Sequence, residues 1–385
     1  MAERSRTRVL VVSDEMEVGG SQRQIVHLLR GLDRTRWDAE LLYFRQRSFL
    51  VDEVRAAGLA IHELPKRHRV DGRFMWRLLM LLRRGRYDIV HCYSLTAELW
   101  VRALLPLLPA CTFIASVRGL CLHHTPAQWR QKRWIVRRAD AVIANARAGA
   151  AVTAARAHLP RERVSVVPNG VTLPPPLDPA QRTQLRASLA LPDGRACGLF
   201  AGRLVAIKNV ALLLRALAQL APAQRPYLLL AGSGPLDEAL RAQATALALT
   251  DDVRFLGERD DAQALMQCAD FLVLCSREEG LSNVVLEAMA VGCPPLASAV
   301  GGNPELIEHE RNGLLFADDD ADALAAALAR LGADPALRLR LGAAARTDAQ
   351  RDFTIEAMVR GTEAVYLQAL ARHRAHFPVE GAAHV

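Results

Sequence analysis

The sequence lacks the patterns that define several common classes of protein. Its seven Cys residues are scattered over 385 residues and form no Cys-x-x-Cys pair, so neither a disulfide framework nor a zinc site is expected. Apolar runs such as Leu78–Leu82 are far shorter than the roughly twenty residues of a membrane-spanning helix. The run Val9–Val12, which follows the basic N-terminus, is too short for the core of a signal peptide. We therefore expect a soluble protein of a reducing cytoplasm.

Positive charge is concentrated in the first part of the chain. Residues 1–170 contain 29 Lys and Arg against 15 Asp and Glu, a net of +14, whereas residues 171–385 have a net of −6. Nearly all of these cations are Arg, which suits the recognition of phosphate groups or of an anionic surface. The sequence contains no recognised nucleic-acid module, so nucleic acid is not an expected partner.

Strand-like apolar runs alternate with helix-like segments along the whole chain. This alternation predicts an α/β fold with parallel sheets that helices cover on both faces. The Pro-rich segment Leu173–Pro179 interrupts the pattern, because it can continue neither a helix nor a central strand. The sequence thus predicts a first domain over 1–172, a linker over 173–190 and a second domain over 191–353. A C-terminal helix over 354–374 is expected to pack back on the first domain.

The predicted strands locate the expected binding region. Ligands of open α/β sheets bind at the carboxyl ends of the strands, so a central cleft between the two sheets is the expected site. In the first domain the predicted strands are 8–13, 39–44, 60–64, 89–92, 112–117, 141–144 and 164–167. In the second domain they are 197–201, 227–231, 253–256, 271–275 and 295–298.

The segment Ser276–Gly292 places two acidic residues around a predicted helix start. Glu279 lies on the loop after a predicted strand, and Glu287 lies about one turn inside the helix that Ser282 or Asn283 would cap. The free N–H groups of such a helix N-terminus attract an anion. Two carboxylates at this place could hold two hydroxyl-rich groups, such as a sugar and a ribose. A capped helix with two incidental acidic residues is the alternative.

Two loops that follow predicted strands are suited to phosphate groups. Arg203 and Lys208 follow the first strand of the second domain, where two cations could hold a diphosphate and stabilise the charge that develops as it leaves. A solvated basic loop is the alternative. Gly19 and Gly20, with Ser21 as a cap, form a strand-to-helix turn whose backbone N–H groups could meet a phosphate. A simple connector is the alternative there, and the pattern is not Gly-x-Gly-x-x-Gly.

The segment from Glu279 to Glu287 resembles the Glu-x7-Glu signature of the family 4 glycosyltransferases, which have the GT-B fold. Other segments resemble motifs of this family in the same order along the chain: Gly19-Gly20, Val166–Val171, Ala201–Asn209, Ala231–Pro235, Val300–Glu305 and Asn312–Phe316. The resemblance implies two Rossmann-like, doubly wound parallel-sheet domains that face a central cleft. It also implies retaining transfer of a sugar from a nucleotide diphosphate, with a UDP-sugar favoured over GDP-mannose. Neither a metal nor another cofactor is expected.

The resemblance also implies roles for individual residues. Arg203 and Lys208 would bind the donor diphosphate, Glu279 the hydroxyls of the transferred sugar, and Glu287 the ribose. In the front-face route that is usual for this family, the leaving phosphate oxygen takes the acceptor proton, so Glu279, Arg203 and Lys208 would carry catalysis. The full set expected to bind the donor is Gly19, Gly20, Gly202, Arg203, Lys208, Gly232, Gly257, Glu279, Gly280, Leu281, Ser282, Asn283 and Glu287.

Three residues at strand ends of the first domain are further candidates. His91 could touch the donor sugar or the acceptor and is added to the catalytic set, with a structural role as the alternative. Arg118 stands near the place where many members of the family carry a His, and it could bind an acceptor phosphate. Asn145 ends the next strand and is a second acceptor-binding candidate, with a capping role as the alternative.

Two basic segments that contain Trp, residues 73–84 and 128–138, could lie on an anionic bilayer. For the first segment, an amphipathic helix packed on the sheet is favoured, and for the second both interpretations stay open. The resemblance and the charge together suggest a glycan or lipid-linked acceptor in the synthesis of cell-surface polysaccharide or lipopolysaccharide. The expected location is the cytoplasm, with peripheral contact at the inner face of the plasma membrane. A non-catalytic nucleotide-sugar-binding subunit and a GT-B sugar epimerase are the alternatives.

Overall fold

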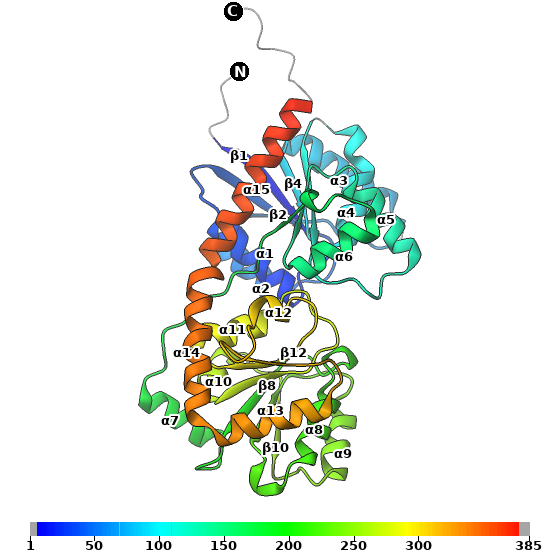
Figure 1. Ribbon diagram of the computed structural model, residues 1–385. Helices are drawn as coiled ribbons and strands as arrows, with labels where there is room; N and C mark the ends of the chain where they lie inside the picture. The colour runs from blue at the N-terminus through cyan, green and yellow to red at the C-terminus, as the bar shows by residue number, and fades with distance from the viewer. Residues whose placement is uncertain (1–5, 69, 109, 377–385) are drawn as a thin grey trace, which may run out of the picture. The chain divides into compact units, whose positions relative to one another are not determined.

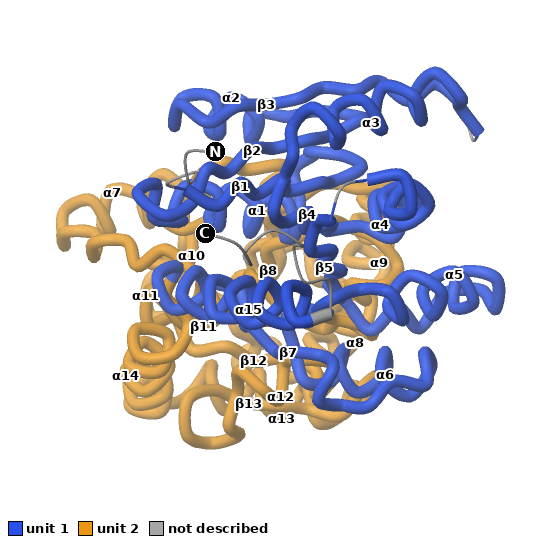
Figure 2. Tube along the Cα trace, turned by 90° about the horizontal axis from the view of Figure 1, so that it is seen from above, with its two compact units in different colours: residues 1–170, 355–385 blue, residues 171–354 orange. Residues whose placement is uncertain are grey.

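The computed structural model describes residues 6–68, 70–108 and 110–376. The chain divides into two compact units, shown in Figure 1 and coloured separately in Figure 2. Unit 1 comprises residues 1–170 and 355–385, and unit 2 comprises residues 171–354. In each unit, parallel strands alternate with helices along the chain, as the sequence predicts.

The described part of unit 1 forms a seven-stranded parallel sheet with the order β3-β2-β1-β4-β5-β6-β7. Its strands are β1 Thr7–Val12, β2 Trp37–Tyr43, β3 Ala60–Glu63, β4 Ile89–Cys92, β5 Thr112–Val117, β6 Ala141–Ala144 and β7 Val164–Val166. Its helices are α1 Gly20–Gly31, α2 Phe49–Ala56, α3 Gly72–Gly85, α4 Leu95–Leu104, α5 Pro126–Val136, α6 Arg147–Ala157 and α15 Ile355–His376, with short 3-10 turns η1 Leu105–Leu107 and η2 Arg161–Arg163. The strand order reverses between β1 and β4, which makes this the switch point of the sheet.

The sheet of unit 1 is buried on both faces. Val9 and Val11 belong to the core that α1, α2 and α15 cover, whereas Leu10 and Val12 belong to the core on the other face. Successive side chains of a strand point to opposite faces, so a continuous apolar run is needed when both faces are covered. Tyr366 of α15 is fully buried in the first core. Helix α15 packs against α1, β5 and β6, so the C-terminal segment belongs to the first unit although it follows the second in sequence.

The described part of unit 2 forms a six-stranded parallel sheet with the order β10-β9-β8-β11-β12-β13, which reverses between β8 and β11. Its strands are β8 Cys197–Ala201, β9 Tyr227–Ala231, β10 Val253–Gly257, β11 Phe271–Leu274, β12 Pro295–Ser298 and β13 Leu314–Phe316. Its helices are α7 Pro179–Ser188, α8 Val210–Gln219, α9 Asp237–Ala246, α10 Ala262–Cys268, α11 Asn283–Val291, α12 Asn303–Leu306, α13 Ala321–Ala333 and α14 Pro335–Asp352, with 3-10 turns η3 Ala206–Lys208 and η4 Pro222–Gln224.

The segment 173–190, for which the sequence predicts a linker, contains a helix and belongs to unit 2. Pro179 is the first residue of α7, where its fixed φ is favourable and the missing N–H is not needed. Asp178 and Gln181 form a capping box at this end. The Leu177 N–H donates to Gln267 Oε1 at 2.6 Å, and Arg186 Nη1 donates to the Cys268 carbonyl at 2.7 Å. The sequence predicts that the prolines of this segment cannot continue a helix. Pro179 instead stands at the start of one.

A buried ion pair joins two helices to the sheet of unit 1. Lys132 of α5 donates to both carboxylate oxygens of Glu98 on α4 at 2.7 Å, and these residues are 5% and 0% exposed. Glu98 Oε1 accepts the Ser116 N–H at 2.9 Å, and Lys132 Nζ donates to the Ser116 carbonyl at 2.8 Å. The pair therefore satisfies both backbone groups of one residue near the end of β5.

The network continues through the sheet to the opposite face. Ser116 Oγ lies 2.8 Å from His91 Nε2, and His91 Nδ1 lies 2.8 Å from Tyr366 Oη on α15. His91 is 1% exposed and Tyr366 is fully buried. A single chain of polar contacts thus connects helices on both faces of the sheet. Buried polar groups are costly without partners, so this chain favours one arrangement of the helices.

Removing one partner of the ion pair should destabilise unit 1. Lys132→Met leaves the Glu98 carboxylate buried without its cation and should lower the free energy of unfolding by about 3–5 kcal/mol. The double variant Glu98→Gln/Lys132→Met should recover most of this loss, because it removes both charges. Denaturant unfolding of the full chain measures the three values. A Lys132→Met variant within about 1 kcal/mol of wild type would contradict the role given to the pair.

Two histidines, His91 buried and His27 partly buried, make stability depend on pH. Burial lowers the pKa of His91 to about 3 and that of His27 to about 4, with nearby Arg118 and Arg23 adding to the effect. Both rings are neutral in the folded chain but titrate near 6.5 when unfolded. Below about pH 6.5 the unfolded chain therefore binds protons that the folded chain does not bind, and stability falls toward pH 4. Above pH 6.5 these groups add no pH dependence.

The variant His91→Asn isolates one of these contributions. From pH 6.5 to 5.5 its unfolding free energy should fall by about 1 kcal/mol less than that of wild type, because one imidazole no longer gains a proton on unfolding. The comparison uses the change with pH in each variant, so the constant loss of the His91 hydrogen bonds cancels. Identical pH slopes in the two proteins are the opposing outcome.

Candidate functional site

Two loops meet at the switch point of the unit 2 sheet. The loop after β8 and the loop after β11 leave adjacent strands at the carboxyl edge. The Arg277 N–H donates to the Ile207 carbonyl at 2.9 Å, which joins the two loops. Lys208 Nζ donates to Glu279 Oε1 at 2.5 Å, so two residues that lie 71 positions apart and were both predicted for the site form an ion pair. The crevice at such a switch point is the usual ligand site of this sheet type.

The Lys208–Glu279 pair is partly buried but reachable. The two side chains are 22% and 11% exposed. Lys208 ends the turn η3, and the next residue, Asn209, has a φ of +49° and bonds to Asp319 Oδ1 at 3.3 Å through its side-chain amide. This left-handed residue turns the chain from the loop into α8. An ion pair in such a place can exchange its partners for the charged or hydroxyl groups of a ligand.

Glycines allow the loops at this edge to approach one another closely. Gly301, after β12, has a φ of +55°, and a Cβ there would lie 1.9 Å from the Glu279 carbonyl oxygen. The neighbouring Gly302 N–H donates to the Gly280 carbonyl at 2.8 Å. At Gly232, after β9, a Cβ would lie 1.9 Å from the Gly202 carbonyl oxygen. Both positions therefore require glycine, and Gly301 supports the loop that carries Glu279.

Helix α11 begins beside Glu279. Ser282 occupies the N-cap position but its side chain accepts no hydrogen bond from the first turn, and that turn carries no acidic residue. Ser282 therefore occupies the predicted N-cap position, but its side chain does not make a capping hydrogen bond. A helix start without a side-chain cap retains amide donors and positive potential for an anion. Glu287 lies in the same helix, within its second turn.

The other predicted donor residues of unit 2 lie at the same edge. The Arg203 side chain is exposed and makes no ion pair or hydrogen bond with the residues that the structure describes. Gly257 ends β10, and its carbonyl accepts the Gly232 N–H at 2.7 Å. Leu281 is 6% exposed and is part of the support for the loop. The structure therefore gathers the unit 2 candidates at the carboxyl ends of β8, β9, β10 and β11.

Gly19 and Gly20 lie after β1, at the switch point of unit 1. Gly19 is the N-cap of α1 with extended backbone, and Gly20 is the first helical residue. Ser21, which the sequence suggested as the cap, is therefore inside the helix, because the N-cap lies two residues earlier than predicted. The first turn has no side-chain cap and no acidic residue. Like α11, this helix start can attract an anion.

His91 does not have the exposed position that a direct chemical role requires. The sequence placed it in the catalytic set, but its ring is 1% exposed and both nitrogens lie 2.8 Å from protein hydroxyls, those of Tyr366 and Ser116. Burial keeps the ring neutral by lowering its pKa to about 3. The geometry supports the structural alternative, because neither nitrogen faces an open site. The pattern of a strand-end His could not reveal partners that come from β5 and α15.

The acceptor-binding candidates lie at neighbouring strand ends of unit 1. Arg118 Nη2 donates to Asn169 Oδ1 at 2.8 Å, and the guanidinium lies 5.1 Å from the centre of the Tyr93 ring. Asn145 is 3% exposed, and its N–H donates to the Val117 carbonyl at 3.1 Å. Neither Arg118 Nε nor Asn145 Oδ1 has a hydrogen-bond partner in the described part of the chain. Both of these atoms are buried, so neither is open to a ligand in this arrangement.

Two residues of this group were not among the predicted site residues. Asn169 follows β7, and Tyr93 follows β4, so both lie at the carboxyl edge that carries Arg118. The motif Val166–Val171 contains Asn169, but the resemblance to the family implied no role for this residue. A polar residue after a predicted strand was the available signal for Asn169. The described residues contain no group of three or more His, Cys, Asp or Glu that could hold a metal ion.

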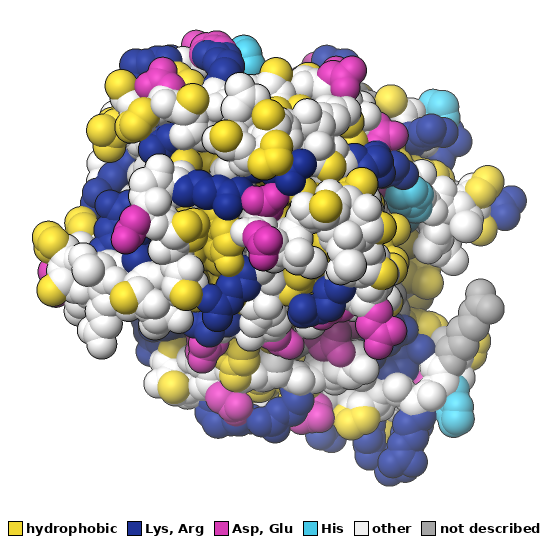
Figure 3. Space-filling model, turned by 90° about the horizontal axis from the view of Figure 1, so that it is seen from below, with side chains coloured by type: hydrophobic (Ala, Val, Ile, Leu, Met, Phe, Trp, Pro, Cys, Tyr) yellow, Lys and Arg dark blue, Asp and Glu magenta, His cyan; other side chains and the backbone are white. Residues whose placement is uncertain are grey.

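The two Trp-containing basic segments differ in what they expose. In α3, Phe74, Leu78 and Leu82 are buried with helical spacing, which confirms packing on the sheet, although Trp76 is 62% exposed. In α5, Lys132 is buried in its ion pair and cannot face a membrane. No described helix is long and apolar enough to cross a bilayer. On the face of the molecule in Figure 3, basic and acidic side chains are interspersed.

The fold and the comparisons with known proteins define the class of protein. A family model described as Glycosyltransferase Family 4 matches residues 18–173, and one described as Glycosyl transferases group 1 matches residues 181–348. The chain is 33% identical over 343 residues to a D-inositol 3-phosphate glycosyltransferase of Streptomyces scabiei, covering 82% of this chain and 76% of that protein. A lipopolysaccharide core biosynthesis glycosyltransferase, LpsD of Rhizobium meliloti, is 37% identical over 158 residues, covering 41% of this chain and 45% of that protein.

Solved structures agree with this assignment. The Anabaena protein HepE in complex with UDP has a TM-score of 0.84 at 20% identity, covering 94% of this chain and all of that chain. The lipopolysaccharide outer core galactosyltransferase WaaB has a TM-score of 0.72 at 19% identity, covering 94% and 99%. At these identities the likeness shows the fold, which is GT-B. The chain belongs to the GT-B glycosyltransferases, with a family 4 domain followed by a group 1 domain.

The steric role of Gly301 leads to a stability prediction. Gly301→Ala should lower the free energy of unfolding by about 2–4 kcal/mol, because it adds a clash with the Glu279 carbonyl to the strain of a left-handed residue. Gly194→Ala is a matched control, since Gly194 has a φ of +71° and no atom within 4 Å of the added Cβ. It should cost only about 1 kcal/mol. Equal losses in the two variants would show that the approach to Glu279 is not tight.

Proposed function

We propose that this chain is a retaining glycosyltransferase that uses a nucleotide-diphosphate sugar, with a UDP-sugar favoured and GDP-mannose next. The acceptor is a hydroxyl of a glycan or lipid-linked molecule of cell-surface polysaccharide or lipopolysaccharide synthesis. The observation that carries the proposal is the Lys208–Glu279 pair at the β8/β11 switch point, with the Arg203 loop on the same edge. Such a pair offers one cation for a phosphate and one carboxylate for sugar hydroxyls.

The donor roles follow from charge and position. Lys208 and Arg203 hold the diphosphate and stabilise the charge that grows on it as its bond to the sugar breaks. The start of α11 adds amide donors. Glu279 accepts hydrogen bonds from the transferred sugar, and Glu287 binds the ribose hydroxyls. That Gly19 and Gly20 meet the donor phosphates stays a prediction, supported by the uncapped start of α1.

The transfer needs no enzymic nucleophile in this proposal. The bond between the anomeric carbon and the phosphate oxygen breaks as the acceptor oxygen bonds to the same face of that carbon. The leaving phosphate oxygen takes the acceptor proton, so the products are the glycoside and the protonated nucleoside diphosphate. The protein contributes orientation and electrostatic stabilisation, and no metal or other cofactor takes part.

Known relatives support the choice of substrates. HepE structures were solved with UDP and with UDP-glucose, which supports a UDP-sugar as the first donor to test. The Streptomyces relatives are named D-inositol 3-phosphate glycosyltransferases, and LpsD acts in lipopolysaccharide core biosynthesis. A phosphorylated acceptor suits the positive charge of Arg118 at the carboxyl edge of unit 1, with Asn145 as a second contact. The charge of residues 1–170 and the exposed Trp76 and Trp134 support peripheral contact with an anionic membrane at the cytoplasmic face.

Two other functions use parts of the same site. A non-catalytic nucleotide-sugar-binding subunit would keep donor affinity without transfer, and a GT-B epimerase would release an isomerised sugar. The presence of Arg203, Lys208, Glu279 and Glu287 together favours transfer over both. Assays of the purified chain alone distinguish the three, because their products differ.

Charge removal at the switch point should abolish most of the activity. Lys208→Ala and Glu279→Ala should each lower kcat by about a hundredfold or more, because each removes a group that binds the reacting part of the donor. The measurement is transfer of labelled sugar from UDP-sugars and GDP-mannose by the full chain, with and without excess chelator. Arg330→Ala on α13, which breaks an exposed ion pair with Glu310, is the control and should keep wild-type activity.

The outcomes separate the parts of the proposal. Near-normal turnover by a well-folded Lys208→Ala or Glu279→Ala variant excludes the catalytic role of that residue. Donor binding without transfer, across all acceptors tried, favours the subunit alternative. Loss of transfer in chelator, restored by a divalent cation, contradicts the metal-independent mechanism. Stabilisation by UDP but not GDP in a thermal-shift assay identifies the nucleotide, because a ligand stabilises the state that it binds.

A further inference from the structure

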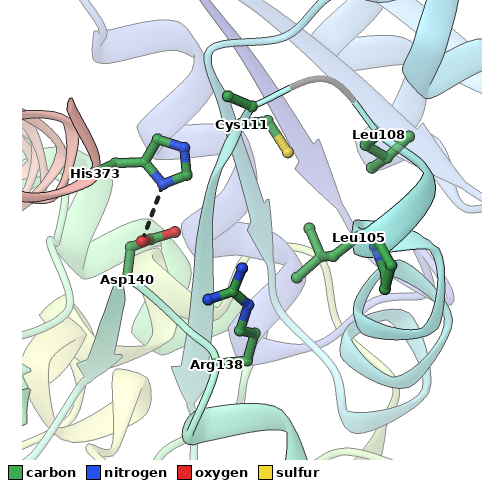
Figure 4. Close-up of a pocket in the computed structure, with 8 residues that line it drawn as sticks. Leu105, Leu108, Cys111, Arg138, Asp140 and His373 are labelled. Carbon is green, nitrogen blue, oxygen red and sulfur yellow. Dashed lines mark hydrogen bonds and ion pairs between the residues drawn. The ribbon is translucent and has the colours of Figure 1, made fainter. Parts of the chain in front are cut away.

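Unit 1 contains a pocket far in sequence from the donor loops. It is a cavity of about 270 Å³ at the amino ends of β5 and β6, lined by Leu105, Pro106, Leu108, Ala110, Cys111, Arg138, Asp140 and His373. These residues come from η1, from the chain just before β5 and β6, and from the end of α15 (Figure 4). The candidate residues of unit 1 lie at the opposite, carboxyl edge of the same sheet. The proposed transfer reaction therefore gives this pocket no role.

The pocket has an apolar side and a polar side. Leu105, Pro106 and Leu108 supply aliphatic surface, and Figure 4 shows Arg138 turned into the space between Leu105 and Asp140. Burial raises the pKa of Cys111 to about 12, so its thiol stays protonated at neutral pH and adds uncharged surface rather than a nucleophile. A guanidinium opposite aliphatic side chains suits a ligand with an anionic end and an apolar end.

The carboxylate in the pocket is already occupied by protein donors. Asp140 Oδ2 accepts the Phe113 N–H at 2.8 Å, and Asp140 Oδ1 lies 3.1 Å from His373 Nδ1. These contacts hold the end of α15 against the starts of β5 and β6. Both oxygens of Asp140 therefore have protein partners, and the carboxylate is held in place by the fold.

A second cavity adjoins the first and is strongly basic. Its volume is about 480 Å³, and it shares Arg138 and Asp140 with the first. Its other described lining residues include Arg137, Arg163 and Arg372, with Glu162 as the second acid. Four guanidinium groups thus face two carboxylates, which leaves an excess of positive charge. The combined space is of the size that small ligands occupy in proteins.

Exposed apolar side chains also lie close in sequence to the lining residues. Leu107, in the turn that supplies Leu105 and Pro106, is 54% exposed. Trp134, one turn before Arg138, is 42% exposed, and the Arg102 guanidinium lies 4.1 Å from its ring centre. Apolar surface beside a basic pocket extends the same combination of chemistry beyond the cavity.

We propose that this pocket is a second ligand site, which binds a phosphate group joined to a short apolar chain. The phosphate lies against Arg138 and its neighbouring guanidinium groups, and the chain lies against Leu105 and Leu108. This chemistry is shared by a phospholipid at a membrane surface and by a soluble alkyl phosphate. The site is independent of the donor site, so its test does not depend on sugar transfer.

The test uses hexyl phosphate and inorganic phosphate as soluble probes, titrated calorimetrically into the full chain. Hexyl phosphate should bind more tightly than inorganic phosphate, because the pocket also buries the alkyl chain. Arg138→Ala should weaken hexyl phosphate binding about tenfold or more, which is the usual loss for a hydrogen bond to a charged group. Leu108→Ser should weaken hexyl phosphate binding but leave inorganic phosphate unchanged. Arg360→Ala, an exposed position on α15, removes the same charge outside the pocket and should bind as wild type.

Flotation with phosphatidylglycerol–phosphatidylcholine vesicles then distinguishes the two sources of the ligand. Vesicle binding that is lost in Arg138→Ala but kept in Arg360→Ala supports a phospholipid, and hexyl phosphate binding without vesicle binding supports a soluble ligand. The proposal is overturned if hexyl phosphate does not bind, or if Arg138→Ala and Arg360→Ala weaken its binding equally. Circular dichroism and the melting temperature of each variant show whether a loss of binding reflects unfolding.

Discussion

All strands of a parallel sheet end at the same edge, and this constraint places every predicted donor residue of unit 2. Helices must connect one strand to the next, so each strand delivers its following loop to the carboxyl edge. The reversal of strand order between β8 and β11 then puts the Lys208 loop beside the Glu279 loop. Residues 71 positions apart form an ion pair because their strands are neighbours. The same rule places Gly19 of unit 1 next to the strand that ends near His91.

In unit 2, the close approach of the loops depends on glycine. In unit 1, the arrangement of the helices on the sheet depends on a series of buried polar contacts. Gly301 and Gly232 let backbones meet at distances that any side chain would prevent. In unit 1, the Lys132–Glu98 pair holds Ser116, and Ser116 leads through His91 to α15. Arg118 lies two residues after Ser116, so the buried pair also fixes the strand end that carries the acceptor candidate. The same ion pair therefore stabilises the core of unit 1 and the position of its proposed acceptor residue.

Particular residues show where inference from sequence succeeded. The spacing of apolar residues predicted β4, β5 and β6 with their observed bounds, because a strand buried on both faces is a continuous apolar run. The Glu279 and Lys208 loops were predicted because each follows such a strand. By contrast, the helices α13 and α14 were not predicted, and the segment that forms α7 was predicted as part of the linker. Proline inside a helix interrupts it, but proline at the first helical position favours the start of a helix.

The sequence by itself determined the α/β class and the glycosyltransferase family, and it predicted a set of donor residues in unit 2. Each of these depends on local patterns: apolar runs, turn residues and short motifs that follow strands. The tertiary structure alone decided which side chains are accessible. Lys132 and Arg203 are both cations in basic segments, yet one is buried against Glu98 and the other is exposed. His91 is buried between the hydroxyls of Ser116 and Tyr366, away from the site. The fold also places Asn169 within hydrogen-bond distance of Arg118. Such pairings join residues from distant strands and helices, so only packing brings them together.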